Sequence, residues 1–327
     1  MHPLVSVLLP VYNGEATLHE AIESVLEQDY DPFELVIVDN ASTDGTAEII
    51  AGFKNDWRVR VVRNDYTLPR LDNFVKAFDS ASSESRWLKF TGDDDRLLPG
   101  CLWEMVQAGE AAGGPEQVGL VSSHYYDSDR LVTGILTQES VVVKGSQFLR
   151  RMLLEPEARS TIFSPASLLI SHPVYRELGP FRTDLLHADS ELFYRILNRY
   201  DLAFVHKPLT VTGYHKESGQ AGSTAMGHTF SESYLIRYDH LKQYDNVRVS
   251  AMEVEKIKLN LVKDSIGFML ARVAGGQWGL ALGHLKKIPP KAWYHLPLGC
   301  GYFAGLALNK LIRGEKVRLL KERNKEQ

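Results

Sequence analysis

Short apolar runs alternate with amphipathic segments in the N-terminal part of this chain, and this alternation restricts the possible folds more than any other feature. The runs that resemble buried strands are residues 4–9, 33–38, 59–63 and 87–91. Between the first two runs, apolar residues recur at the spacing of one face of a helix. Strands that alternate with helices through short connections are typical of a parallel sheet with right-handed crossovers. The sequence therefore predicts the α/β fold class.

The pattern changes near residue 226. Short strands are predicted at 202–205 and 209–214, and beyond them the chain shows long helical patterns without strand-like runs. A chain of 327 residues has room for one large domain or two moderate ones. We therefore expect an α/β domain over residues 1–225 and a C-terminal helical region over residues 226–327.

The composition is that of an ordinary globular protein. Hydrophobic residues make up 44% of the chain and the net charge is −4, so no global basic field points to nucleic acid. Two cysteines, Cys101 and Cys300, form no metal-binding or disulfide pattern and favour a reducing compartment. The N-terminus lacks the basic region of a signal peptide, and no apolar stretch reaches about 18 residues, the length of a membrane-spanning helix. We therefore expect a cytoplasmic protein.

Residues 286–325 combine an apolar, aromatic centre with lysine and arginine on both sides. One interpretation is an interfacial helix on an anionic membrane, which would place the protein at the inner face of that membrane. The alternative is a helix that packs on its own domain or on a second copy of the chain, with a solvated basic tail. Peripheral membrane contact and a homodimer through the C-terminal helices are both open.

Three consecutive carboxylates follow the last of the four apolar runs. The run stops at Gly92, and Asp93, Asp94 and Asp95 come directly after it. Adjacent acids at a strand end repel one another unless a cation or hydrogen-bond donors compensate them. Oxygen ligands suit Mg²⁺ or Mn²⁺, and these ions commonly bridge to substrate phosphates. The stretch therefore favours either a metal–diphosphate site or a solvated acidic turn that caps the next helix.

Three further polar features lie at the ends of predicted elements, on the side where open α/β sheets bind ligands. Tyr12 would stack on a planar base or simply pack its turn. Asp39 would accept a hydrogen bond from a base or a ribose hydroxyl, but no GxGxxG motif supports a hydride-transfer site. Asp189 and Glu191 open an amphipathic helix, where acids stabilise the helix dipole unless one of them is a general base.

Five segments, taken in order, resemble the inverting nucleotide-sugar glycosyltransferases of glycosyltransferase family 2. The segments are VSVLLPVYNG, FELVIVDNASTDGT, LKFTGDDDRLLP, HADSELFYRIL and GYHKES, and they cover residues 4–218. The resemblance implies the GT-A fold, a Rossmann-like and mostly parallel sheet flanked by helices. It also implies transfer of a hexose or deoxyhexose from a UDP, dTDP or GDP sugar to a hydroxyl of a saccharide or lipid-linked saccharide, as in polysaccharide or lipopolysaccharide biosynthesis.

The resemblance also assigns roles to residues of the donor site. The donor nucleotide would be held by Pro10, Tyr12, Asn13, Asp39, Asn40 and Asp93. Asn40 stands where the family has a second aspartate, which leaves the identity of the base open. The metal, Mn²⁺ or Mg²⁺, would be held by Asp94 and His215. The first aspartate of the family's Asp-x-Asp motif falls on Gly92, so the motif is shifted here.

The general base that the resemblance implies is Asp189. Leu192 and Arg195 set the register of that motif, in which Ala188 stands where the family has a glutamate. Secondary candidates for the site are Asp95, Glu191, Arg195 and Ser218. For His215 the alternative is a structural surface histidine.

Two other functions are compatible with parts of this pattern. A sugar nucleotidyltransferase would also be an α/β protein with a metal–diphosphate site. It would need a basic, glycine-rich loop near the first strand, and residues 10–20 contain no lysine or arginine. A non-catalytic module that binds nucleotide sugars would explain the departures at Gly92 and Ala188.

Overall fold

The computed structural model describes residues 2–133, 141–155, 164–185, 188–213, 244–274 and 276. The chain divides into two compact units, Met1–Gln220 and Ala221–Gln327. The first unit contains all the strands among the described residues, and the second contains one long described helix.

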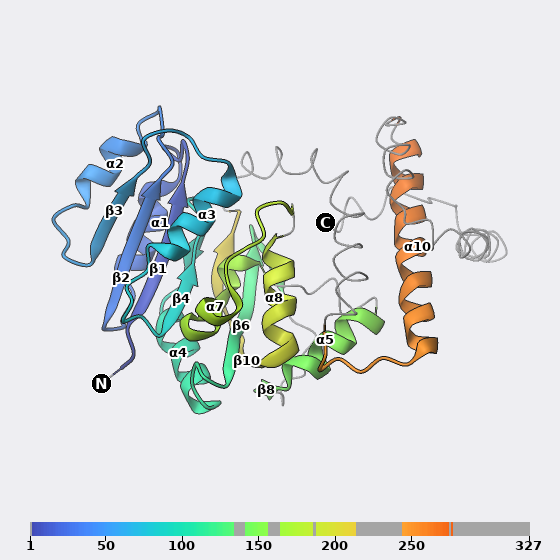
Figure 1. Ribbon diagram of the computed structural model, residues 1–327. Helices are drawn as coiled ribbons and strands as arrows, with labels where there is room; N and C mark the ends of the chain where they lie inside the picture. Colours follow the sequence, from blue (N-terminus) through green and yellow to red (C-terminus); the bar gives the residue numbers. More distant parts are fainter. Residues whose placement is uncertain are drawn as a thin grey trace. The chain divides into compact units, whose positions relative to one another are not determined.

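One mixed sheet runs through the N-terminal unit (Figure 1). Its strands are β1 Val5–Val11, β2 Phe33–Asp39, β3 Val59–Arg63, β4 Trp87–Phe90, β5 Arg96–Leu97, β6 Val118–Asp127, β7 Arg130–Val132, β8 Val142–Val143, β9 Leu168–Ser171 and β10 Asp201–Thr212. The main order is β3-β2-β1-β4-β9-β6-β10-β5. Strand β9 is antiparallel to both of its neighbours, β4 and β6, and the pairs β1–β2, β1–β4, β2–β3 and β6–β10 are parallel. Strands β1, β2, β3, β4, β6 and β10 therefore all point in one direction.

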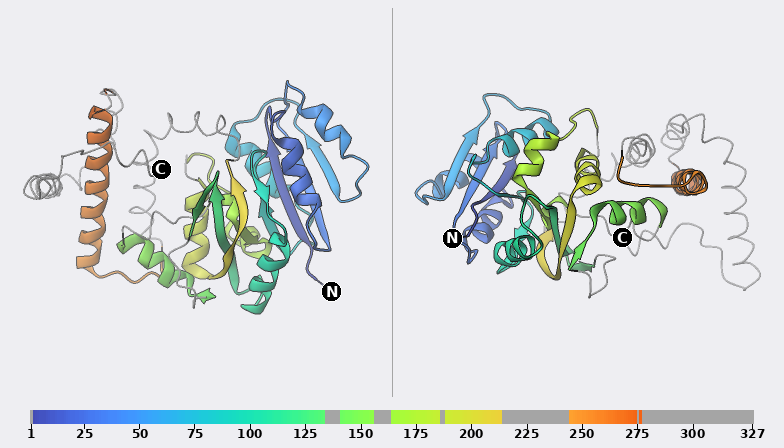
Figure 2. Two further views of the ribbon diagram at one scale, coloured as in Figure 1. Left: turned by 180° about the vertical axis from the view of Figure 1, so that it is seen from behind. Right: turned by 60° about the horizontal axis from the view of Figure 1, so that its bottom comes forward.

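Helices cover both faces of this sheet. They are α1 Leu18–Leu26, α2 Thr46–Gly52, α3 Arg70–Asp79, α4 Cys101–Ala111, α5 Gly145–Leu154, α7 His172–Leu178 and α8 Ala188–Arg199, with a 3₁₀ turn η1 at Pro165–Ser167. Alternate residues of β1, such as Val7 and Leu9, share one core with α1 and α4. On the other face Phe78 of α3 packs against Phe90 of β4 and Tyr175 of α7. The view from behind shows α1, in dark blue, in front of the sheet (Figure 2).

The predicted α/β class with a mostly parallel sheet is confirmed. Every residue of β1 is buried, as expected for a parallel strand between two helical layers. Strand structure was predicted correctly over most of 202–205 and 209–214, but the predicted break between them was wrong, because one strand, β10, runs from Asp201 to Thr212. Its pairing with β6 shifts register on either side of Pro208. Proline has no N–H to donate to a strand ladder, which explains the irregularity at this point.

The C-terminal unit is described through one helix, α10 Ala251–Ala274. Ile257 and Ile266 on this helix are buried. Within the described part of the chain, no helix combines the length and the apolar character needed to span a bilayer. The basic and aromatic segment 286–325 lies outside the described residues.

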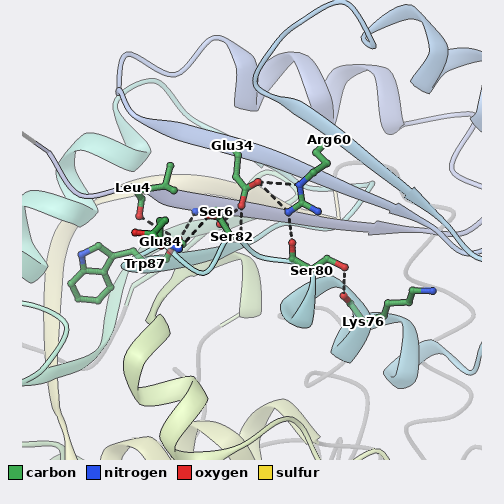
Figure 3. Close-up of polar contacts among 10 residues, drawn as sticks. Leu4, Ser6, Glu34, Arg60, Lys76, Ser80, Ser82, Glu84 and Trp87 are labelled. Carbon is green, nitrogen blue, oxygen red and sulfur yellow. Dashed lines mark hydrogen bonds and ion pairs between the residues drawn. The ribbon is translucent and has the colours of Figure 1, made fainter.

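A polar ladder crosses the first three strands and positions β4 (Figure 3). Glu34 of β2 accepts the Ser6 hydroxyl of β1 at 2.5 Å and the Ser82 N–H at 2.7 Å. Arg60 of β3 pairs with Glu34 at 3.1 Å and donates to the Ser80 carbonyl. Because Ser80 and Ser82 lie between α3 and β4, the ladder fastens this connection to the sheet.

We expect Glu34→Gln to lower the free energy of unfolding by about 1–3 kcal/mol, because it leaves Arg60 without its anion and places an amide N–H against a donor. Urea denaturation followed by circular dichroism measures the change. Glu84→Gln is the matched control, because Glu84 lies in the same connection and its side chain is exposed. Equal midpoints for the two variants would contradict a structural role for the ladder.

Candidate active site

The carboxyl ends of the parallel strands meet at one edge of the sheet, and most of the predicted donor-site residues lie there. Val11 at the end of β1 is in register with Asp39 at the end of β2. Strand β4, on the other side of β1, ends at Phe90, so the turn with the three aspartates follows at the same edge. Pro10 is buried within β1, whereas Tyr12 just beyond it is 49% exposed. Tyr12 is therefore accessible to a ligand at this edge.

Hydrogen bonds join the turn after β1 to the loop after β2. Asn13 donates its backbone N–H to Ser42 Oγ at 3.0 Å, and its Oδ1 accepts the Thr43 N–H at 2.9 Å. Gly14 donates its N–H to Thr46 Oγ1 at 2.9 Å. These hydrogen bonds hold the two segments together, and the Asn13 side chain is one of the groups that join them.

Asp39 is 1% exposed and is held by two partners. Its Oδ1 accepts the Ser42 N–H at 2.9 Å, and its Oδ2 pairs with the guanidinium of Arg63. Arg63 ends β3, donates to the Ser42 carbonyl at 2.9 Å and is about half exposed. Arg63 was not among the site residues predicted from the sequence. It could have been recognised because it ends the predicted strand 59–63, which follows the strand that ends near Asp39.

Asn40 makes its hydrogen bonds within the protein. Its side chain is 3% exposed, donates to the Leu68 carbonyl at 2.9 Å and accepts the Leu68 N–H at 2.8 Å. Asn64 donates to Asn40 Oδ1 at 2.7 Å and to Asn73 Oδ1 at 2.9 Å. The amide at position 40 therefore holds the connection between β3 and α3. This arrangement supports a structural role for Asn40 rather than direct contact with a base.

The acid turn concentrates negative charge in a partly buried place. Burial, reinforced by the neighbouring Asp94 carboxylate, raises the pKa of Asp93 to about 7. Burial and Asp94 also raise the pKa of Asp95, to about 6. Asp93 packs on the backbone of the β1 turn, since a Cβ on Gly14 would lie only 2.6 Å from Asp93 Oδ2. The glycine at position 14 thus makes room for the Asp93 carboxylate.

The carboxylate of Asp95 accepts two backbone amides. Its Oδ2 accepts the Gly92 N–H at 2.8 Å and its Oδ1 accepts the Gly213 N–H at 3.3 Å. A Cβ at position 92 would lie 2.8 Å from Asp95 Oδ2 and 3.0 Å from Asp94 Oδ1. A side chain at position 92, such as the aspartate of the family motif, would therefore require the Asp95 carboxylate to shift.

The described residues contain no group of three or more His, Cys, Asp and Glu side chains arranged to hold a metal ion. Asp93 and Asp94 nevertheless fit an ion that takes its other ligands from a diphosphate. Mg²⁺ and Mn²⁺ are commonly held by one or two carboxylates together with phosphates and water. The raised pKa of Asp93 indicates negative charge that a cation would compensate.

Asp189 lies in the first turn of α8, and the packing of this helix directs that turn toward the same edge of the sheet. Ile196, near the end of α8, packs directly against Gly119 at the start of β6. Helix α8 ends at Arg199 and the chain turns directly into β10 at Asp201, which is parallel to β6, so α8 runs antiparallel to both strands. At about 1.5 Å per residue, Asp189 lies roughly 10 Å from Ile196 toward the carboxyl end of β6. Its Oδ1 accepts the Ser190 N–H at 2.7 Å.

Glu191 and Arg195 form a structural clamp on α8. Glu191 is 1% exposed and pairs with Arg195 Nε at 2.8 Å, one helical turn along. Arg195 also donates to the carbonyls of Leu178 and Pro180, the latter at 2.8 Å. The pair therefore fixes α8 to the end of α7. His215 and Ser218 lie outside the described residues.

Residues 6–158 match the sequence model described as Glycosyl transferase family 2. This segment, just under half of the chain, is similar to glycosyltransferase family 2. A curated relative, the GalNAc(5)-diNAcBac-PP-undecaprenol beta-1,3-glucosyltransferase of Campylobacter jejuni, is 33% identical over 107 residues, 32% of this chain and 34% of that protein. The chain spans 66%, 61% and 34% of the length of three curated relatives that it matches.

Two solved structures share the fold of this chain. TarS from S. aureus, in complex with UDP-GlcNAc, has a TM-score of 0.64 at 18% identity and covers 89% of this chain and 83% of its own. The mannosyltransferase PcManGT from Pyrobaculum calidifontis, in complex with GDP-Man and Mn²⁺, has a TM-score of 0.56 at 19% identity and covers 92% and 85%. The predicted GT-A fold is confirmed.

The acid turn predicts a pH-dependent stability in the metal-free protein. The folded-state pKa of Asp93 is about 7, above its usual value of 3.8, so folding stability is lost as the pH rises toward and through 7. In EDTA, Asp93→Asn should lie within about 1 kcal/mol of the wild type at pH 4 and exceed its free energy of unfolding by roughly 2–4 kcal/mol at pH 8. Urea denaturation at both pH values measures this.

Asp129→Asn is the control for that measurement. Asp129 is an exposed acid on the turn between β6 and β7, so its replacement removes the same charge from the surface. It should behave like the wild type at both pH values. Equal stability of wild type and Asp93→Asn at pH 8 would show that Asp93 ionises at no cost to the fold.

Proposed function

We propose that this protein is an inverting glycosyltransferase that moves a sugar from a nucleoside diphosphate to a hydroxyl of a saccharide or lipid-linked saccharide. The observation that carries the proposal is the convergence of the β1 turn, Asp39 and the acid turn on one edge of the sheet. Helix α8 directs Asp189 toward that edge. The similarity of residues 6–158 to glycosyltransferase family 2 supports the same reaction type.

The donor would lie along this edge with its base between the β1 turn and β2. The exposed ring of Tyr12 is available to stack on the base. Asp39 and Arg63 together offer an acceptor and a donor of hydrogen bonds to the base or ribose. Asp93, against Gly14, is the candidate contact to the ribose or to metal-bound water. TarS binds UDP-GlcNAc and PcManGT binds GDP-Man, so UDP, dTDP and GDP sugars are all candidate donors here.

The cofactor of this site would be Mn²⁺ or Mg²⁺, held by Asp94 with His215 as a second candidate ligand. The Mn²⁺ in the PcManGT complex supports a divalent cation. Such an ion supplies stabilisation of the negative charge that develops on the leaving diphosphate.

Asp189 would be the general base. Its carboxylate accepts the proton of the acceptor hydroxyl while that oxygen forms a bond to the anomeric carbon of the donor sugar. The bond between the anomeric carbon and the diphosphate oxygen breaks, and the diphosphate leaves with the electron pair. Attack from the face opposite the leaving group inverts the configuration. The Glu191–Arg195 clamp would hold Asp189 in place for this step.

The acceptor side would be built by residues 164–185, which precede Asp189. The name of the Campylobacter relative specifies an undecaprenol-linked acceptor, which supports a lipid-linked saccharide here. A lipid-linked acceptor would place the reaction at the cytoplasmic face of a membrane. The C-terminal helices would then supply either the membrane contact or a homodimer interface.

A thermal-shift screen of UDP, dTDP and GDP sugars with Mn²⁺ tests the donor class. At about 100 times its dissociation constant, the correct donor should stabilise the protein by about 2.7 kcal/mol, which corresponds to a rise in Tm of several degrees. The rise should disappear in EDTA. Absence of a shift with every nucleotide sugar would remove the proposal.

Product analysis then separates the rival functions. A glycosyltransferase should slowly hydrolyse its donor to free sugar and nucleoside diphosphate when no acceptor is present. Binding without hydrolysis or transfer would indicate a non-catalytic module. Release of pyrophosphate from a nucleoside triphosphate and a sugar phosphate would indicate a nucleotidyltransferase.

Asp189→Asn should lower kcat by about 10²–10⁴-fold, the usual contribution of a general base. The thermal shift produced by the donor should stay unchanged, because Asp189 acts on the acceptor. Asp29→Asn is the control, since Asp29 is an exposed acid on the connection between α1 and β2, at the edge of the sheet opposite the candidate site. Wild-type turnover by Asp189→Asn would exclude Asp189 as the base.

A further inference from the structure

Asp95 lies at the centre of a set of hydrogen bonds that joins separate parts of the carboxyl edge. It is 8% exposed, and its two oxygens accept the N–H groups of Gly92 and Gly213. Its own N–H donates to the Gly92 carbonyl at 3.3 Å. One side chain therefore closes the turn after β4 on itself and fastens it to the end of β10.

The end of β10 is held from a second side by the turn between β6 and β7. Ser128 donates its N–H to the Thr212 carbonyl at 2.9 Å and its hydroxyl to the Gly213 carbonyl at 3.1 Å. Gly213 has a φ of +62°, a conformation that favours glycine. The Gly213 peptide is thus clamped, with its amide on Asp95 and its carbonyl on Ser128.

A buried lysine lies close enough to Asp95 to affect its charge. Lys89 of β4 is fully buried and donates to the carbonyls of Ala166 and Leu168 at the start of β9. Its positive charge favours the ionised form of Asp95 and so opposes the larger effect of burial on the pKa of that residue. Two amides and the Lys89 side chain therefore stabilise the Asp95 carboxylate in part, against the larger effect of burial.

We propose that Asp95 is a positioning residue, which holds the turn that presents Asp93 and Asp94 and ties this turn to β10, and that it does not bind the cation. The inference rests on the proposed function, because Asp93 and Asp94 are the donor-side acids of that proposal. It concerns contacts that exist without donor or metal, so it is testable even if the proposed function fails.

Hydrogen exchange of the full-length protein, without metal or nucleotide, tests the contacts. Asp95→Ala should speed exchange of both the Gly92 and Gly213 amides by about 10-fold or more, the effect of losing a buried hydrogen bond. Asp95→Asn keeps one acceptor oxygen and should free only one of the two amides. Asp129→Asn, the matched control, should free neither. Unchanged protection of both amides in Asp95→Ala would overturn the proposal.

Adding Mn²⁺ with UDP or GDP to the wild type separates positioning from metal binding. A positioning residue keeps both amides, so their protection should stay the same or increase. If Asp95 turned to the cation, at least one amide would lose its acceptor and exchange faster, and the proposal would be wrong. If neither nucleotide binds, the proposed function fails while the metal-free exchange still decides the role of Asp95.

Calorimetry with the nucleotide that binds wild type distinguishes positioning from a purely structural role. Asp95→Ala should raise the dissociation constant about 10-fold while the number of sites per folded chain stays at the wild-type value. A purely structural role would lower the number of sites and leave the dissociation constant unchanged, which would overturn the proposal. Conservative Asp95→Asn should fall between the wild type and Asp95→Ala.

Discussion

Six strands of the sheet run in the same direction, and this determines where the candidate active site lies. Parallel strands deliver their carboxyl ends to one edge, and the crossover helices carry the chain back to the other. The segments after β1, β2 and β4 therefore meet although they lie far apart in the chain. Helix α8 runs antiparallel to β6, so its first turn also points toward this edge. Every residue that we propose for donor or acceptor chemistry depends on this arrangement.

The acids of that edge differ in the groups that compensate their charge. Asp39 is buried and neutralised by Arg63, and Asp95 is held by two amides beside the buried Lys89. Burial and the neighbouring Asp94 raise the pKa of Asp93 to about 7, the larger of the two increases in this turn. Desolvated negative charge of this kind is characteristic of functional sites. The edge therefore combines acids that maintain the structure with acids that a cation would stabilise.

Three departures from the family pattern have physical explanations in this fold. Asn40 replaces an acid and bonds the Leu68 peptide through both its N–H and its oxygen, which a carboxylate could not do. Gly92 lies in a turn that closes on Asp95. Ala188 is fully buried at the start of α8, where an unpaired glutamate would be costly. None of these changes removes Asp94 or Asp189, the two acids to which we assign the chemistry.

The sequence by itself determined the alternation of strands and helices, the position of the acid turn at a strand end and the order of the family segments. These features depend on residues close together in the chain, and local patterns report them. Only the tertiary structure decided that Arg63 pairs with Asp39, that Asn40 bonds Leu68 and that Asp95 bonds Gly213, 118 residues away. Such pairings depend on the register between strands and on competition among partners in three dimensions. No local pattern contains that information, so equivalent aspartates in one short motif acquire different roles only when the chain is folded.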